Sequence, residues 1–484
     1  MLSDTEASPG PPSPAWGLAR KMRQWADYSL GFDLRSLALL RIAAPSVYLC
    51  ELLLHWKYIE AYYTDNGLLP RPGIFEGSSW SIYLAFGSLD GAHFLYVCQI
   101  LALLCLILGW RTRWASLACY VFTTSLQNRF PALPGWEAEI RLLFLIGCFL
   151  PWGTWASLDA RGESTPRPVF VVSAATVAWR LQVVILYLAS GLLKGGPGWQ
   201  DGTAVEVSLA SDAYATSFGL WVLAHLKHHP QSLVVLNYAV PLLEIFAPLF
   251  LLSPWPRIQM LWVVVLWLLH AGFGLCLSIG MFSPICCACL IGFLPSSFLD
   301  RWWPSKESSR VAPLRIWESA FLTWVSLSMA ISAVENLPEY KDVVRPQVHR
   351  PWKALGLEQF WGMFVPPPFE GGWHVIKGKT LKGNWVNLLQ QTAEASEERP
   401  ELISSTYPGV RGYLFLASYL RQPNPEHQYI QESVADYYRR RWEAGHPGAQ
   451  DRLSEVEILF FKRQYVPGQG YTEAQRILIH SHTY

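Results

Sequence analysis

Residues 180–194 read RLQVVILYLASGLLK, an apolar stretch that ends on a lysine and is followed by GGPGW. About 20 predominantly apolar residues are enough for a helix to cross the hydrocarbon core of a bilayer. A charged amine is costly at the end of such a helix unless another group uses it, and an amine held partly out of water can act as a base. The stretch therefore predicts a membrane-spanning helix and makes Lys194 a candidate catalytic residue. The alternative is that its side chain snorkels to water.

The composition indicates a membrane domain followed by a water-soluble domain. Of 484 residues, 51% are hydrophobic and 15% are charged, whereas soluble proteins carry about 25% charged residues. The deficit of charge falls between Arg35 and Val334. A net charge of +1 without a long basic stripe argues against nucleic-acid binding. We predict an α-helical polytopic membrane protein with a disordered cytoplasmic leader over 1–30, a transmembrane domain over 31–335 and a small soluble α+β domain over 350–484.

Nine membrane-spanning helices are predicted from apolar windows of about 17 to 25 residues. The third and eighth are short, and residues 203–225 are interpreted as a re-entrant or interfacial helix, so a count of eight or ten stays open. The nine windows are 36–54, 93–110, 114–129, 138–157, 170–194, 232–252, 258–280, 281–298 and 313–334.

The distribution of basic residues predicts the orientation in the membrane. With nine spans, most of the Lys and Arg residues outside the helices, such as Arg113 and Arg301, fall on the side of the N-terminus. Cytoplasmic loops carry the excess of Lys and Arg. The N-terminus is therefore predicted to be cytoplasmic and the C-terminal domain extracytoplasmic, in an integral membrane protein.

The soluble domain has local signals for both helix and strand. Two strands flanking KGN at 382–384 are expected to form a hairpin, with a helix over 432–442 and strands over 457–462 and 476–482. The segment FWGMFVPPP at 360–368 is expected to form an amphipathic joint on the bilayer, because Trp and Phe favour the interface.

Several ionisable residues lie inside predicted spans, among them Arg41, Arg141, Arg180, Glu244 and His270. Each costs about 2.5–3.5 kcal/mol at a helix centre when it is unpaired. They are therefore expected to face one another or a cavity. The alternative is that the arginines and the glutamate form structural pairs, and that the histidine is hydrogen-bonded within the core.

Neither a disulfide framework nor a metal site is predicted. All nine cysteines lie in or beside apolar segments, and the close trio Cys286, Cys287 and Cys289 has no neighbouring His or carboxylate in the sequence. The terminal pair His480 and His482 has no third ligand beside it.

The order and spacing of four motifs resemble the HTTM family of membrane proteins, whose best understood member is the vitamin K-dependent gamma-glutamyl carboxylase. The resemblance extends from about residue 30 to about residue 300. Its motifs are SLALLRI at 36–42, WASLD at 155–159, RLQVVILYLASGLLK at 180–194, and His270 with SIGMFS at 278–283.

The resemblance implies chemistry for these residues. In the carboxylase, the lysine that matches Lys194 deprotonates vitamin K hydroquinone, oxygen converts the quinol to an epoxide, and carbon dioxide adds to a protein glutamate. The implied cofactors are reduced vitamin K or menaquinol, oxygen and carbon dioxide, with the bilayer, the quinol and a protein or peptide glutamate as partners. His270 is implied as a quinone-site or proton-relay residue, and Arg41, Arg180, Trp136 and Glu137 as cofactor-binding residues.

The chain also departs from the carboxylase, and resembles a bacterial-type member with a short tail. It has GWE at 135–137 in place of an Asn-His pair, and Leu193 in place of the first of two adjacent lysines. Its short soluble part argues against a substrate recognised through a propeptide.

Two classes of function remain. One is quinol-linked epoxidation or carboxylation with Lys194 as the base. The alternative is a non-catalytic membrane protein: a lipid or quinone carrier, or an assembly factor whose outer domain binds a partner. A transporter is a weaker third possibility, since no internal repeat is visible.

Overall fold

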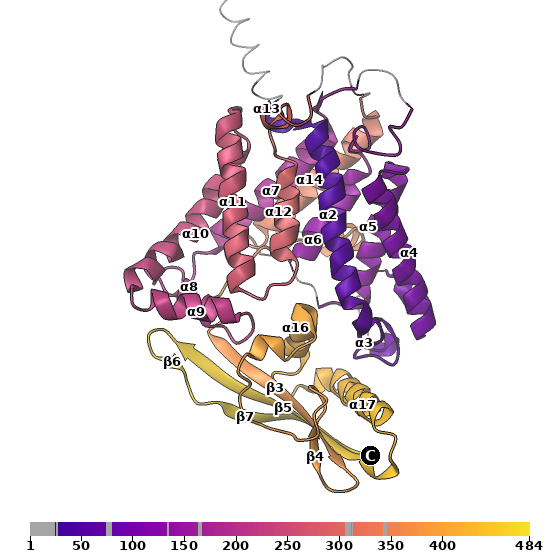
Figure 1. Ribbon diagram of the computed structural model, residues 1–484, viewed down its shortest axis with the longest axis vertical. Coiled ribbons are helices and arrows are strands. Elements are labelled where there is room, and N and C mark those ends of the chain that lie inside the picture. Colours follow the sequence, from indigo (N-terminus) through magenta and orange to yellow (C-terminus); the bar gives the residue numbers. More distant parts are fainter. Residues whose placement is uncertain are drawn as a thin grey trace, which may run out of the picture.

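A helical bundle with a sheet-rich domain against one end makes up the computed structural model (Figure 1). We refer to residues 28–341 as the membrane domain and to residues 346–484 as the tail. The leader predicted over 1–30 falls almost wholly outside the described residues. The structure describes residue 25 and residues 28–73, 80–132, 135–162, 167–304, 311, 313–341 and 346–484.

Each of the nine predicted spans contains a helix at its position. Among the described residues, six helices are long and apolar enough to cross a membrane: α2 (with its extension to Tyr63), α4, α7, α10, α11 and α14. The helical membrane domain is confirmed, whereas nine crossings are not. The nine helices are α2 (Leu34–His55), α4 (Leu89–Leu108), α5 (Thr112–Arg129), α6 (Trp136–Gly147), α7 (Ala174–Leu193), α10 (Pro230–Leu251), α11 (Pro256–Cys276), α12 (Phe282–Ile291) and α14 (Ile316–Val334).

Helices α6 and α12 are much shorter than the windows 138–157 and 281–298 suggested. Helix α6 has 12 residues and is buried along nearly its whole length, and α12 has 10 residues. A helix that is apolar on all sides has the same sequence pattern whether it is enclosed by protein or by lipid. Irregular backbone at membrane depth is tolerated where protein encloses it. Helices α6 and α12 can therefore end before their predicted windows do, because neighbouring helices enclose the chain that follows them.

The stretch 203–225 forms two short helices rather than one re-entrant helix. They are α8 (Ala204–Ala210) and α9 (Ser217–Leu226), and the Thr216 side chain caps α9 by accepting from the Gly219 N–H. The chain between them carries Asp212, which contacts the tail. The membrane domain also contains α3 (Ile59–Tyr63), α13 (Ser296–Leu299) and the paired strands β1 (Phe32–Asp33) and β2 (Phe170–Val171), and α15 (Pro346–Ala354) begins the tail.

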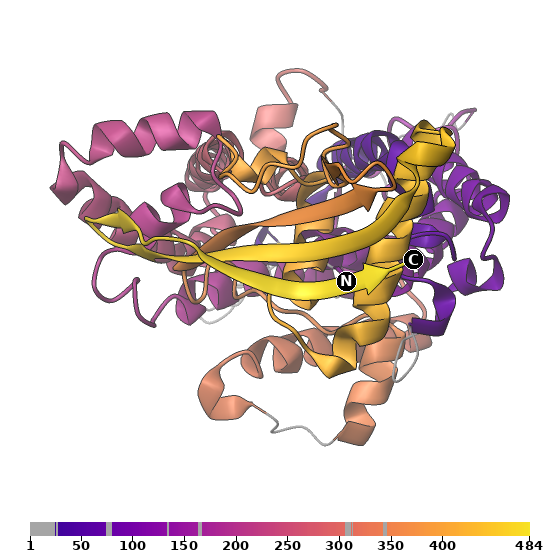
Figure 2. The same cartoon turned by 90° about the horizontal axis from the view of Figure 1, so that it is seen from below.

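The tail is an antiparallel sheet with three α-helices, and it extends across the end of the bundle (Figure 2). The predicted hairpin, the helix over 432–442 and both later strands are present, whereas α16 was not predicted. Strand β5 pairs with β3, β6 and β7, and β3 also pairs with β4. The elements are β3 (Glu370–Thr380), β4 (Trp385–Asn387), α16 (Gly409–Tyr419), α17 (Gln428–Gly445), β5 (Leu453–Val466), β6 (Gly470–Tyr471) and β7 (Gln475–Thr483).

The segment 360–368, predicted as an amphipathic joint on the bilayer, is irregular chain that packs between the membrane domain and the sheet of the tail. The Trp361 side chain is fully buried, and its indole donates to Gln359 Oε1 at 2.8 Å. The indole of Trp199, which follows α7, donates to the Phe364 carbonyl at 2.8 Å. These contacts place the segment beneath the membrane helices.

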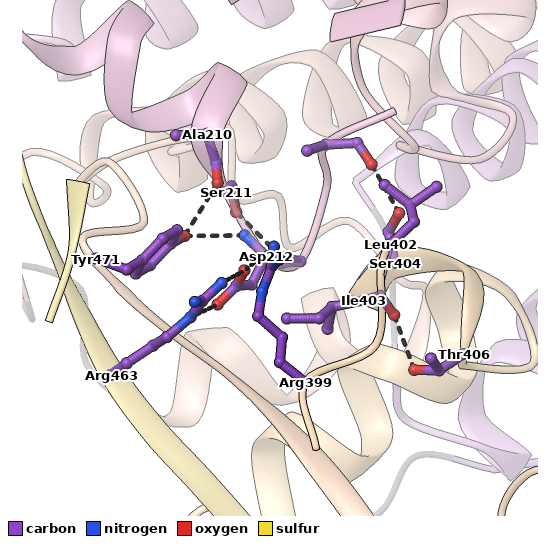
Figure 3. A network of polar contacts seen from close by, with 12 residues as sticks. Ala210, Ser211, Asp212, Arg399, Leu402, Ile403, Ser404, Thr406, Arg463 and Tyr471 are labelled. Carbon is purple, nitrogen blue, oxygen red and sulfur yellow. Dashed lines mark hydrogen bonds and ion pairs between the residues drawn. The ribbon is translucent and has the colours of Figure 1, made fainter. Parts of the chain in front are cut away.

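A buried carboxylate fastens the tail sheet to the membrane domain (Figure 3). Arg463 of β5 donates from Nε to Asp212 Oδ2 at 2.7 Å and from its Nη2 to Oδ1. Arg399 Nη2 lies 3.9 Å from the same carboxylate. The Tyr471 hydroxyl donates to the Ala210 carbonyl at 3.1 Å and accepts from the Asp212 N–H at 3.0 Å. The loop between α8 and α9 is thereby tied to β5 and β6.

Replacing Asp212 is expected to loosen the tail. The Asp212→Ala change leaves the Arg463 guanidinium buried without its carboxylate, which costs about 3–5 kcal/mol for a buried pair. Limited proteolysis of the full-length protein in detergent should then release the tail faster. Asp451→Ala removes the carboxylate from the exposed Lys382, where a surface pair contributes about 0–1 kcal/mol. Equal proteolysis of the two variants would contradict the assignment.

A buried histidine lies inside the tail. His374 Nε2 donates to the Leu420 carbonyl at 3.0 Å, and Nδ1 accepts from the Tyr407 hydroxyl at 3.0 Å. This arrangement uses both nitrogens of a neutral ring. Burial, together with the nearby Arg421 charge, lowers the pKa of His374 to about 3.

The tail should therefore lose stability in acid. Below pH about 6.5 the unfolded imidazole binds a proton, whereas the folded ring remains neutral until about pH 3, so stability falls as the pH is lowered through this interval. His374→Gln should flatten the dependence of the tail's urea midpoint on pH, and His482→Gln, at an exposed position, should retain it. An unchanged slope in His374→Gln would exclude this residue as the cause.

Candidate functional site

Lys194 is paired with a carboxylate inside the protein instead of reaching water. Its Nζ lies 2.7 Å from Glu244 Oε2, 2.9 Å from Ser190 Oγ and 3.1 Å from the Ser190 carbonyl. Only 4% of the Lys194 side chain and 6% of the Glu244 side chain are exposed. The amine is thus held in a buried site with an opposite charge and two further hydrogen-bond acceptors.

The pair forms because α7 and α10 approach each other closely. Lys194 caps the C-terminal end of α7, and Glu244 lies in the middle of α10. A Cβ atom on Gly191 would lie 2.7 Å from Ile245 Cγ1 and 2.9 Å from the Pro241 carbonyl. Glycine at this position therefore permits the separation across which the lysine reaches the glutamate.

A cavity of about 530 Å³ lies beside this pair. Of the described residues that line it, only Lys194 and Glu244 carry a charge, and Trp136 and Trp199 add two indoles. The remaining wall is almost entirely aliphatic and aromatic, from α8 to α12, α16 and segment 360–368. Its volume lies within the range of about 300–1,000 Å³ that small-molecule sites occupy. The combination suits an apolar ligand with a small polar group.

The tail forms part of the cavity wall. Val410 and Leu414 of α16 line it, as do Met363 and Phe364 of segment 360–368. The Tyr62 hydroxyl holds the start of α16 by donating to the Pro408 carbonyl at 2.8 Å. The cavity is consequently a site at the junction of the two domains.

His270 lies behind the cavity and not on its wall. Its Nε2 is 2.8 Å from the Tyr187 hydroxyl, and the ring is 1% exposed. The rings of Phe273 and Phe282, which line the cavity, are centred 6.0 and 5.5 Å from the imidazole. Lys194 and His270 therefore do not face the same space, although Tyr187 lies on the same helix as Lys194.

Arg41 and Arg180 lie away from the cavity and stabilise helix packing. Arg41 donates to the carbonyls of Leu106 and Ile107 at 2.7 Å, and Arg180 donates from Nε to the Gly31 carbonyl at 3.0 Å. Neither is among the described residues that line the cavity. Backbone carbonyls therefore satisfy much of the hydrogen-bonding capacity of these two buried guanidinium groups.

The two residues at the start of α6 have different surroundings. Trp136 lines the cavity. Glu137 forms a buried ion pair with Arg411 of α16, and its carbonyl accepts from Gln127 Nε2 at 3.0 Å. Glu137 therefore joins the membrane domain to the tail, whereas only Trp136 can contact a bound molecule.

Sequence reasoning missed the partners at this site. Glu244 was recognised as a costly charge, but its pairing with a lysine 50 positions earlier had no local signal. Arg411 and the α16 residues on the cavity wall were not considered, although an arginine within the apolar run GVRGYLFLASY marks a buried partner. Within the described residues there is no group of three His, Cys, Asp or Glu that could hold a metal ion.

Comparison with known proteins gives a match to the family model of the HTTM domain over residues 31–298. This range is more than half of the chain. No curated protein and no solved structure matches the chain.

The charge pair makes a prediction about stability. Lys194→Met leaves the Glu244 carboxylate buried without its partner, which should lower the unfolding free energy by about 3–5 kcal/mol. Lys194→Met with Glu244→Met replaces both charges by side chains of similar size, so it should be much less destabilised than the single variant. Thermal melting in detergent measures both. If the double variant melted at a lower temperature than the single one, the unpaired charge of Glu244 would not be the cause of the lost stability.

Proposed function

Because the chain belongs to the HTTM-domain family, we propose that it is an integral membrane enzyme that links quinol oxidation to epoxidation or carboxylation, with Lys194 as the base. The observation that carries the proposal is the Lys194–Glu244 pair in the wall of an otherwise apolar cavity. Strongly buried charge in a cleft is typical of functional sites.

The residues of the cavity fit a quinol. Its apolar wall suits a substituted ring, and the one charged region brings the Lys194 amine and the Glu244 carboxylate to the wall. Binding of a ring hydroxyl there would exchange one of the three contacts that the amine makes with Ser190 and Glu244. When bound, a quinol supplies two electrons and two protons to oxygen, so that one oxygen atom enters the quinone ring as an epoxide and the other leaves as water. Lys194 and Glu244 would hold the ring hydroxyl, and Trp136 and Trp199 would contact the ring.

Glu244 gives Lys194 a route to its neutral form. The Nζ proton can be transferred to Glu244 Oε2, which lies 2.7 Å from Nζ, and this leaves an uncharged amine that can accept a proton from a bound acid. Ser190 Oγ, 2.9 Å away, keeps the amine in position. Phe364 and Leu414 cover the tail side of the cavity and limit the entry of water.

We place the N-terminus in the cytoplasm and the tail on the outer side of the membrane, on the basis of the distribution of Lys and Arg. The resemblance to a bacterial-type member supports a bacterial cell membrane. Any acceptor of carbon dioxide, such as a glutamate of a protein or peptide, would then approach from the tail side. His270, hydrogen-bonded to Tyr187, would act indirectly, as a positioning residue.

A non-catalytic quinone or lipid carrier is the second candidate. It is favoured by the complete set of partners around the Lys194 amine, which three acceptors surround. On this alternative the charge pair only stabilises the contact of α7 with α10. The cavity would still bind a quinone.

Epoxide formation tests the proposal. Purified protein in nanodiscs, given reduced vitamin K or a menaquinol and oxygen, should produce the epoxide, detected by mass spectrometry. Lys194→Met should reduce the rate about 10²–10⁴-fold, as expected for loss of a general base, and Lys227→Met, at an exposed lysine, should not. Quinone that binds without any epoxide from the wild type would favour the carrier. Equal rates for Lys194→Met and the wild type would exclude the lysine as the base.

A further inference from the structure

The cavity is bordered by side chains that also face the outside of the bundle. Leu268 on α11 lines the cavity and is 67% exposed, and Leu236 on α10 lines it and is 41% exposed. Gly272, one turn further along α11, is also both exposed and part of the wall. Both helices are among those long and apolar enough to span a membrane. The outside that these residues face is therefore the lipid.

The two helices are in contact at one end and separated at the other. The Phe250 and Trp262 rings stack with centroids 4.4 Å apart, close to the connection between α10 and α11. Val240 and Gly272 each lie ten residues from this stack, which is about 15 Å along each helix. Both line the cavity, so the cavity lies between the halves of the helices nearer the tail. In Figure 1, α10 is inclined relative to α11.

The residues that line the cavity change from apolar on its lipid-facing side to charged on its inner side. The described lining residues of α9 and α11, such as Val222, Leu226 and Leu269, carry no charge. The charged pair lies on the inner side, where α7 meets α10. A molecule that enters between the helices must therefore have a hydrocarbon part at the opening and a polar group at Lys194.

We propose that the gap between α10 and α11 is a lateral opening to the bilayer. A membrane-dissolved ligand with a small polar head and a long hydrocarbon tail enters head first, and its tail remains between Leu236 and Leu268 in the lipid. Gly272 sets the width of the opening. That the polar head is a quinol rests on the proposed function. The entry route between α10 and α11 does not depend on it.

Gly272 is well suited to a test because it can be enlarged without a clash. A Cβ atom built on it meets no described atom within 4 Å. Gly272→Trp and Gly272→Leu should therefore fold and obstruct the opening. Leu275→Trp is the matched control, because Leu275 lies on the same helix, is 59% exposed and is not among the lining residues.

The experiment uses the full chain in nanodiscs that contain a phospholipid with a diazirine at the end of one acyl chain. After illumination, mass spectrometry locates the labelled residues. Trp136 and Phe282, which are 1% and 4% exposed and line the cavity, should be labelled in the wild type and in Leu275→Trp. Labelling of both should fall several-fold in Gly272→Trp and Gly272→Leu, while the melting temperatures remain close to that of the wild type.

Each other outcome overturns the proposal. Absence of label from Trp136 and Phe282 in the wild type means that lipid chains do not enter, and equal labelling of Gly272→Trp and the wild type means that entry lies elsewhere. The labelling does not require turnover. Labelling of the cavity without epoxide formation would therefore contradict the proposed quinol chemistry but not the proposed lateral opening. Where epoxide forms, Gly272→Trp should slow turnover of a long-tailed quinol but not of a tail-less one.

Discussion

The ion pair of Lys194 and Glu244 determines how the centre of this protein is built. Two opposite charges that are almost completely removed from water are tolerated only when they meet directly, so α7 and α10 must remain in register and in close contact. Gly191 permits that contact by leaving room for Ile245 and the Pro241 carbonyl. The apolar cavity beside the pair then keeps the charges in a medium where their attraction is strong.

Further buried charges connect the two domains. Glu137 pairs with Arg411, and Asp212 pairs with Arg463, so each contact joins an acid of the membrane domain to a base of the tail. These two ion pairs hold the tail at separate places around the cavity. Its helix α16 contributes wall residues to the same space. The cavity and the domain interface are thus one structural unit.

The local parts of this architecture could be predicted from the sequence, and the long-range parts could not. The hairpin around Gly383 has a turn signal within a few residues, and each apolar window contains a helix. The length of α6 was overestimated because an apolar helix surrounded by protein has the same kind of sequence as one surrounded by lipid. Glu244 was identifiable as a costly charge, but only the packing of α7 on α10 gives it Lys194 as a partner. Phe364 of the tail also lines the cavity. The sequence around it has no hydrophobic periodicity from which this position could be predicted.

The wall contributed by α16 has a consequence for biogenesis. Domains form in order during synthesis, N-terminal parts first, and residues 409–419 follow the last helix of the membrane domain, α14. The Lys194–Glu244 pair can therefore assemble within the bilayer while the chamber beside it still lacks one side. Docking of the tail completes this chamber, so the newly made membrane domain is inserted before the wall of its cavity is closed.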